Sequence, residues 1–129
     1  MTTFGPHVMF DFHTESKRLA DVGYWEDLLI SLVNRIEMTP LSDPVVLPSV
    51  CENPRWDPPV ATGLSGFIVL AESHISFHSF VEAKFVFLDI FSCKDFQSAA
   101  VLGFLSRELG LDGTCVVQQS NRGAGFPFS

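Results

Sequence analysis

The sequence has few cationic side chains, few cysteines and no long apolar run. Lysine and arginine together number 8, against 15 aspartates and glutamates, which gives a formal net charge of −7 at pH 7. Nucleic acids and anionic membranes bind basic surfaces, so this balance argues against both as partners. No apolar run approaches the roughly 20 residues of a membrane-spanning helix, and the N-terminal residues lack the basic-then-apolar pattern of a secretory signal. These absences predict a cytoplasmic protein.

The cysteines and histidines do not indicate disulfides or a metal centre. Cys51, Cys93 and Cys115 form an odd set without paired spacing, which is typical of reduced thiols in the cytoplasm. His74 and His78 are four residues apart, a spacing that would suit zinc on a helix. The residues around them alternate as in a strand, where about 3.3 Å per residue would separate them by roughly 13 Å. We therefore expect no metal site.

The composition predicts a single folded domain over residues 1–129. Nearly half of the residues are hydrophobic and 13 are phenylalanine, which a disordered chain would not carry. A chain of 129 residues is long enough to bury a core without disulfides.

Hydrophobic periodicity predicts strands interrupted by two helices. Apolar spacings of three and four over residues 19–36 predict an amphipathic helix with Asp21 as its N-cap. A similar pattern predicts a second helix that Asp95 caps and Gly110 ends. Alternating or β-branched runs predict strands over residues 7–13, 45–50, 67–71, 74–80, 85–93 and 114–119. This order predicts an α+β fold, a two-layer sandwich with helices packed on one face of a largely antiparallel sheet.

A cluster of polar side chains lies between the third and fifth of these predicted strands. It holds Ser73, His74, Ser76, His78 and Glu82. Hydroxyl, imidazole and carboxylate groups at strand ends are typical of a functional site. In a regular strand Ser73 would point to the opposite face from His78, so a direct pair would need the chain to kink or to be cut at Ser73.

Three further residues have both a structural and a functional interpretation. Ser65 lies in a Gly-Leu-Ser-Gly sequence that lacks the five-residue spacing of a nucleophile elbow. Cys93 ends a predicted strand beside the polar cluster, and an isolated buried thiol is expected to be inert packing. Trp56 lies in the proline-rich loop 54–59, where its ring would suit a cap on the core as well as a ligand.

The polar cluster also carries a family motif. Residues 71–76 read Ala-Glu-Ser-His-Ile-Ser, His78 follows five residues after the serine of that run, and residues 88–93 read Leu-Asp-Ile-Phe-Ser-Cys. Together with a Gly-x-His sequence at residues 5–7, these segments resemble the small bacterial and archaeal S-adenosylmethionine decarboxylases. Enzymes of that family are made as proenzymes that cut their own chain and turn a serine into a covalent pyruvoyl cofactor.

The resemblance implies where this chain is cut. The expected cleavage site lies between Glu72 and Ser73, which would give fragments of residues 1–72 and 73–129 and a pyruvoyl group made from Ser73. By the same resemblance, the cleaved protomers form a homodimer whose two sites are shared across the interface.

The resemblance also assigns roles in the chemistry. Ser65 and His78 would assist cleavage, and Cys93 would return a proton to the decarboxylated product. The sequence departs from the family after this cysteine, because Lys94 stands where the family has glycine.

The residues that would contact substrate differ more from the family. Glu82 matches a carboxylate that holds the substrate ribose, and Phe80 stands where the family usually has tryptophan. Asp11 falls where the family carries a glutamate. Trp56 is the only large ring near the loop that supplies an aromatic residue against adenine.

These assignments predict the decarboxylation of S-adenosylmethionine, which supplies aminopropyl groups for spermidine synthesis. Two alternatives stay open at this stage. One keeps the pyruvoyl group and changes the substrate to arginine or ornithine. The other is an unprocessed, non-catalytic homologue that acts as a binding partner.

Overall fold

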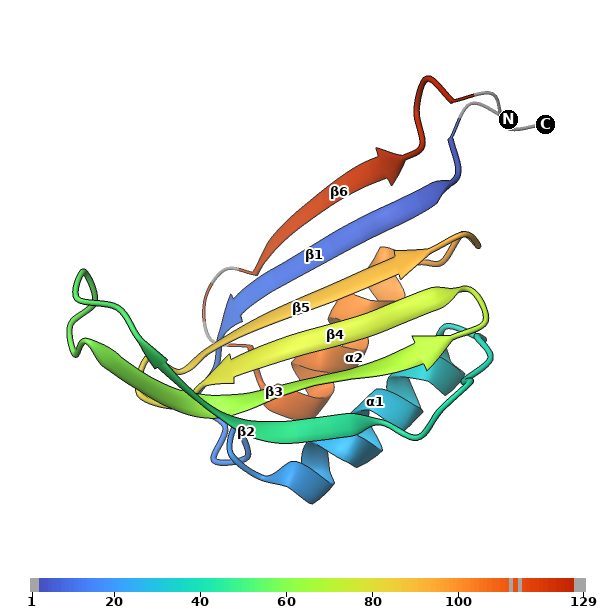
Figure 1. Cartoon of the computed structure of the whole chain (residues 1–129). Coiled ribbons are helices and arrows are strands. Elements are labelled where there is room, and N and C mark those ends of the chain that lie inside the picture. The colour runs from blue at the N-terminus through green and yellow to red at the C-terminus, as the bar shows by residue number, and fades with distance from the viewer. Residues whose placement is uncertain (1–2, 112, 114, 127–129) are drawn as a thin grey trace.

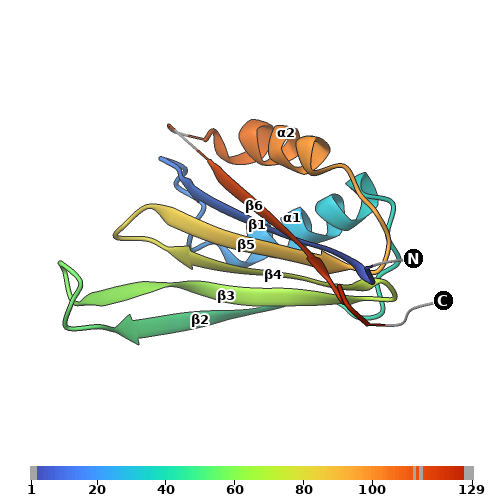
Figure 2. The ribbon, with the colours of Figure 1, turned by 90° about the horizontal axis from the view of Figure 1, so that it is seen from above.

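The chain folds into one antiparallel sheet with helices on one side (Figures 1 and 2). This computed structural model describes residues 3–111, 113 and 115–126. The sheet has six strands in the order β2-β3-β4-β5-β1-β6, and all neighbours are antiparallel. The elements are β1 (Gly5–His13), α1 (Val22–Arg35), β2 (Val45–Glu52), β3 (Val60–Leu70), β4 (Ser73–Phe80), β5 (Phe85–Ser92), α2 (Ser98–Leu109) and β6 (Val116–Arg122). The predicted α+β two-layer architecture is confirmed.

The core lies between the sheet and the two helices. Alternate residues of β1, including Phe10 and Phe12, are fully buried on the helix side, as the alternating sequence predicts. Trp25 of α1 lies flat on Phe77 of β4, with ring centroids 4.0 Å apart and planes 9° apart. This contact fixes the helix layer against the middle of the sheet.

The helix ends test the capping predictions. Asp21 caps α1 as expected, because its carboxylate accepts a hydrogen bond from the Tyr24 N–H at 3.0 Å. The Asp95 cap is wrong: α2 begins at Ser98, and Gln97 holds the N-cap position without a side-chain hydrogen bond. Phe96 packs partly buried against the core, so the chain stays extended until the Gln97 carbonyl accepts the first helical N–H groups. Gly110 ends α2 in the left-handed conformation, as predicted.

β3 and β6 extend beyond their predicted bounds because of their partners. β3 begins at Val60, seven residues before the expected start at residue 67, since β2 pairs with it as far as Glu52 opposite Val60. β6 ends at Arg122 because it pairs with β1 back to Gly5. Thr114, the predicted first residue of this strand, lies outside the described residues.

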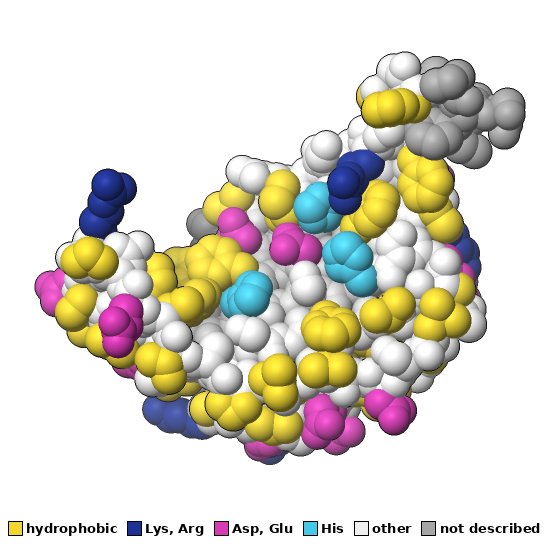
Figure 3. Space-filling model, viewed as in Figure 1, with side chains coloured by type: hydrophobic (Ala, Val, Ile, Leu, Met, Phe, Trp, Pro, Cys, Tyr) yellow, Lys and Arg dark blue, Asp and Glu magenta, His cyan; other side chains and the backbone are white. Residues whose placement is uncertain are grey.

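No other described segment covers the side of the sheet away from the helices, and we call this side the open face. Figure 3 shows apolar side chains, histidines and acidic groups spread across it. Phe67, Val69, Phe85 and Phe87 each expose between 37% and 42% of their surface there. The open face carries His7, Met9 and Asp11 of β1; His74, Ser76 and His78 of β4; Phe85, Phe87, Asp89 and Phe91 of β5; and Ser65, Phe67 and Val69 of β3.

Candidate active site

The structure pairs Ser65 with His78. They lie directly opposite each other on β3 and β4, and the Ser65 Oγ is 2.8 Å from the His78 Nδ1. The Ser49 Oγ of β2 lies 3.1 Å from the Ser65 Oγ and extends this contact to a third strand. An imidazole in contact with a hydroxyl can accept or return its proton, so the pair is equipped for acid–base chemistry.

Ser73 lies in a strained hairpin. Only Ala71 and Glu72 separate Leu70 from Ser73, which pair across the hairpin. Two-residue hairpins favour turns with positive φ at the turn residues, yet among the described non-glycine residues φ is positive only at Ser73, Glu37 and Lys84. The φ of Ser73 is 150°, an unfavourable value for a residue with a side chain. The unfavourable rotation therefore lies about the N–Cα bond of Ser73, next to the Glu72–Ser73 peptide bond.

Glu72 is held at both its carbonyl and its carboxylate. The carbonyl oxygen accepts a hydrogen bond from the Cys93 N–H at 2.9 Å. The carboxylate accepts one from the Thr39 N–H at 3.0 Å, which lowers the pKa of Glu72, and the charge of Lys94 adds to this effect. The Lys94 Nζ donates to the Glu37 carbonyl at 2.8 Å. The end of α1 and the end of β5 thus both support the turn.

Cys93 is exposed, so the expectation of an inert buried thiol is wrong. It follows the last residue of β5, where Ser92 pairs with Ser73 in the register of the sheet. Its side chain lies beyond the end of β5, beside the turn between β3 and β4, and remains accessible. The thiol is therefore available for chemistry next to Ser73.

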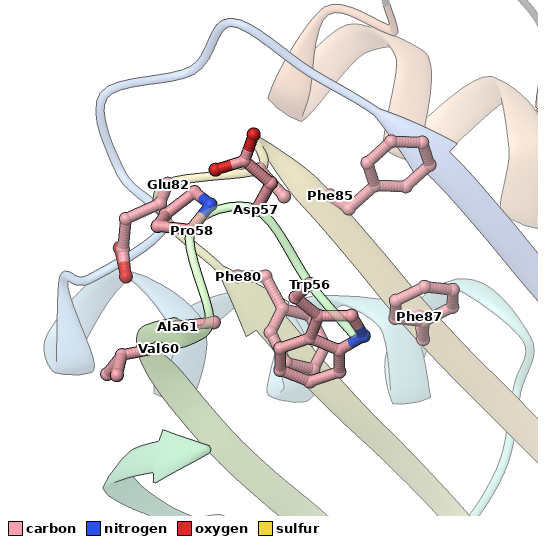
Figure 4. Close-up of a pocket in the computed structure, with 10 residues that line it drawn as sticks. Trp56, Asp57, Pro58, Val60, Ala61, Phe80, Glu82, Phe85 and Phe87 are labelled. Atoms are coloured by element: carbon pink, nitrogen blue, oxygen red, sulfur yellow. The ribbon is translucent and has the colours of Figure 1, made fainter. Parts of the chain in front are cut away.

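An aromatic pocket lies at the far end of β4 and β5 (Figure 4). Its volume is about 370 Å³. Trp56 packs edge-on against Phe80, with ring centroids 6.0 Å apart, and Phe80 packs edge-on against Phe87 at 5.6 Å. The lining residues are Trp56, Asp57, Pro58, Val60, Ala61, Phe80, Glu82, Ala83, Phe85 and Phe87. Trp56 thus lines a pocket instead of capping the core.

Glu82 contributes an ionised carboxylate to this pocket. It accepts hydrogen bonds from the backbone N–H of Thr62 and, at 2.8 Å, from the Thr62 hydroxyl. These bonds stabilise the charged form and lower the pKa of Glu82, with the backbone N–H as the larger cause. Because the folded pKa lies below the unfolded one, the resulting stability is present above the ordinary glutamate pKa and is lost as pH falls through the lowered value.

Asp11 does not reach the pocket. It lies on the open face beside Asp89, where partial burial and then the Asp89 charge raise its pKa. Among the described residues, no three histidine, cysteine or acidic side chains gather closely enough to hold a metal ion. Within the same residues, neither helix has the length and apolar character needed to cross a bilayer.

The candidate residues fall into two groups at different places along β4. Ser73 and Cys93 lie at one end of the strand. The Ser65–His78 pair is five residues further along, about 16 Å at 3.3 Å per residue, and Phe80 in the pocket is roughly 23 Å away. A single chain therefore contains both groups without bringing them together.

Three contacts at these sites are not predicted from the sequence. Thr62 supports Glu82 from 20 residues away, Thr39 supports Glu72 from 33 away, and Ser49 reaches Ser65 from 16 away. Each depends on strand or helix packing between distant segments. Only the register of β2 with β3, once known, would have indicated Ser49.

The same fold occurs in a solved enzyme structure. The adenosylmethionine decarboxylase from Aquifex aeolicus superposes with a TM-score of 0.70 over 100% of this chain and 98% of that chain, at 23% sequence identity. At this identity the likeness establishes the fold. It defines the chain as an α+β protein with the architecture of an adenosylmethionine decarboxylase.

Sequence comparison then identifies the family. A family profile described as S-adenosylmethionine decarboxylase matches residues 6–123. An S-adenosylmethionine decarboxylase proenzyme from Acidithiobacillus ferrooxidans is 26% identical over 112 residues, 85% of this chain and 76% of that protein. One from Thermoplasma volcanium is 48% identical over 48 residues, 36% of this chain and 37% of that protein. The chain belongs to the S-adenosylmethionine decarboxylase family.

The Thr62 contact predicts a specific titration change. In Thr62→Val the hydroxyl donor is lost while the backbone donor remains, so the pKa of Glu82 should rise part of the way towards its ordinary value. Carboxyl-carbon NMR titration measures this pKa directly. Glu72, which bonds to Thr39, is the internal control and should titrate unchanged. An unaltered Glu82 pKa would contradict the role of the hydroxyl.

Proposed function

We propose that this chain is a self-processing, pyruvoyl-dependent decarboxylase of S-adenosylmethionine that supplies aminopropyl groups for polyamine synthesis. The family provides the reaction class. The observation that carries the proposal is the strained Ser73, whose preceding carbonyl accepts a hydrogen bond from the Cys93 N–H.

The geometry around Glu72 suits cleavage by the serine hydroxyl. In the first step the Ser73 Oγ adds to the Glu72 carbonyl carbon and the peptide C–N bond breaks, which leaves an ester. Negative charge develops on the carbonyl oxygen during this step, and the Cys93 N–H donates to that oxygen. The release of backbone strain at Ser73 favours the same direction.

Two further steps would complete the cofactor. Elimination breaks the bond between the Ser73 Cβ and Oγ, so Glu72 leaves as a free carboxylate and residue 73 becomes dehydroalanine. Water then displaces its nitrogen as ammonia and leaves a ketone at the new N-terminus. Ser73 is only half-buried and follows the exposed Ala71 by two residues, so water has access to this position.

The residues near Ser73 fit a pyruvoyl group, and those in the pocket fit S-adenosylmethionine. When present, the pyruvoyl supplies the electron sink that decarboxylation of an amino acid requires. The exposed Cys93 thiol is available to return a proton to the product carbon. Trp56 and Phe80 offer flat faces for adenine and, by cation–π attraction, for the sulfonium. The Glu82 carboxylate can accept hydrogen bonds from ribose hydroxyls.

We further propose that the active form is a homodimer. The roughly 16 Å between Ser73 and His78 prevents one protomer from joining the two groups. In such a dimer a second copy packs on the open face with its strand direction reversed. Ser65 and His78 of one protomer would then lie near the partner's Ser73. The apolar side chains of the open face, including Phe67, support such a contact, because monomers rarely leave a large apolar patch in water.

Self-cleavage is the first test. The wild-type chain should yield pieces of 72 and 57 residues (129 − 72 = 57), with the smaller blocked to Edman chemistry. Ser73→Ala should remain full length. Intact mass and a denaturing gel measure both outcomes. A wild-type chain that stays whole and unmodified after long incubation would favour a non-catalytic binding protein.

Complementation tests whether the site is shared. Ser73→Ala and His78→Ala chains with different tags should each stay uncut alone. When they are co-expressed, a mixed dimer contains one complete site, in which the Ser73→Ala chain supplies His78. Only the His78→Ala chain should then be cut, as a tag-specific blot would report. A His78→Ala chain that stays uncut when it is co-expressed with the Ser73→Ala chain would refute the trans arrangement.

Substrate choice is tested by competition between S-adenosylmethionine, arginine and ornithine in a carbon dioxide release assay. We expect only the first to react. Glu82→Gln should raise KM for it about tenfold or more, because a hydrogen bond to a charged group contributes about 1.5–3 kcal/mol. Asp27→Asn, an exposed change on α1, should leave KM unchanged. Turnover of arginine or ornithine alone would refute the substrate while leaving the cleavage chemistry intact.

A further inference from the structure

We propose that the Lys94 ammonium stabilises the carboxylate of Glu72 that leaves when the chain is cut, so that it speeds the elimination step and not the attack by the serine. This inference rests on the self-cleavage proposed above. It adds a residue that the proposed chemistry does not yet use and assigns it to one step. The family resemblance does not supply this role, because Lys94 stands where the family has glycine.

The backbone places Lys94 beside the bond that would be cut. It follows Cys93, whose N–H donates to the Glu72 carbonyl oxygen at 2.9 Å. The Lys94 N–H donates to the Ser92 hydroxyl at 2.9 Å, and Ser92 pairs with Ser73 in the register of the sheet. The short segment that holds the carbonyl oxygen therefore also carries the ammonium group.

The end of α1 holds the Lys94 side chain. The Nζ donates to the Glu37 carbonyl oxygen at 2.8 Å. Glu37 follows the C-cap residue Ile36, at the end of the helix where the carbonyl groups favour a cation. An ammonium group has three N–H donors, so the contact with Glu37 leaves two for other acceptors. Lys94 is thus anchored and keeps donors for a carboxylate.

The residues after α1 also bind the turn itself. The Thr39 carbonyl accepts a hydrogen bond from the Ala71 N–H at 2.8 Å, and the Thr39 N–H donates to the Glu72 carboxylate at 3.0 Å. This N–H and the charge of Lys94 both lower the pKa of Glu72. The side chains of Glu72 and Lys94 therefore already attract each other in the uncut chain.

Elimination is the step that adds negative charge at residue 72. A base removes the Cα proton of residue 73, the Cβ–Oγ bond breaks, and its electron pair leaves with the oxygen, which becomes part of the new α-carboxylate of Glu72. Residue 72 then carries two carboxylates. The preceding attack converts an uncharged amide into an uncharged ester and leaves no such charge. A nearby cation therefore assists the elimination more than the attack.

Hydroxylamine separates the two steps. It cuts an ester and leaves a peptide bond intact, so it reports the fraction of chains that have undergone the attack without the elimination. The 57-residue piece that it releases (129 − 72 = 57) begins with Ser73 and is open to Edman chemistry, whereas the piece made by elimination is blocked. Full-length chains from a short pulse of cell-free translation are sampled over time in this way.

The variants change the charge at one exposed position. Lys94→Met removes the cation and keeps the length of the side chain, and Lys94→Arg keeps a cation. Lys84→Met is the matched control, because Lys84 is an exposed lysine at the turn between β4 and β5, where it pairs with Glu15 at 2.7 Å.

We expect elimination in Lys94→Met to be about twofold to fivefold slower, the scale of an exposed ion pair. The ester should accumulate, while ester and cut chain together form at the wild-type rate. Lys94→Arg and Lys84→Met should process as the wild type does. In 1 M salt, where the screening length falls to about 3 Å, the difference between Lys94→Met and the wild type should shrink.

The outcomes separate this inference from the proposed function. A Lys94→Met chain that is slower without additional ester would show that Lys94 only supports the turn, and would overturn the inference. Wild-type kinetics in Lys94→Met would also overturn it, and both results would leave the self-cleavage intact. A wild-type chain that never forms either the ester or the cut product would overturn the proposed function itself and this inference with it.

Discussion

The antiparallel pairing of β3, β4 and β5 is the constraint on which the rest of this structure depends. Its hydrogen bonds fix the register, and the pleat sends alternate side chains to opposite faces. A shift of one residue in β4 would bury His78 and expose Phe77, which would remove the stack on Trp25. The same packing that stabilises the core therefore holds the Ser65–His78 pair on the open face. The register of this sheet therefore determines both the packing of the core and the position of the Ser65–His78 pair.

Much of the fold follows from local sequence. Alternation predicts which face Phe10 and Asp11 occupy, the apolar spacing predicts α1, and Asp21 and Gly110 mark helix ends. The prediction of element bounds fails where contacts with a segment distant in the sequence determine them. The start of α2 shifted because Phe96 packs into the core, and the length of β3 depends on β2, whose own sequence is interrupted by Pro48. Pairing partners of this kind cannot be deduced from periodicity.

The sequence proposes candidate site residues and says much less about their arrangement. The family motif predicts roles for Ser73, His78 and Cys93, yet it does not indicate that β4 keeps the first two far apart. The sequence also predicts a buried thiol at Cys93, because a cysteine at the end of an apolar run usually lies in the core. The thiol is exposed because β5 ends at Ser92, beside the turn between β3 and β4. The contacts of Glu82 and Glu72 depend on backbone N–H groups, which no side-chain motif records.

The strand order has a consequence for the proposed cleavage before Ser73. The piece before Ser73 would contain β1, β2 and β3, and the piece after it would contain β4, β5 and β6. In the sheet these strands are interleaved, since β1 lies between β5 and β6 while β3 borders β4. The two pieces would stay associated without any covalent link, through the pairings of β3 with β4, β5 with β1 and β1 with β6. Once unfolded, however, they would have to find each other from solution, so the processed protein would regain its structure only in a concentration-dependent way, unlike its single-chain precursor.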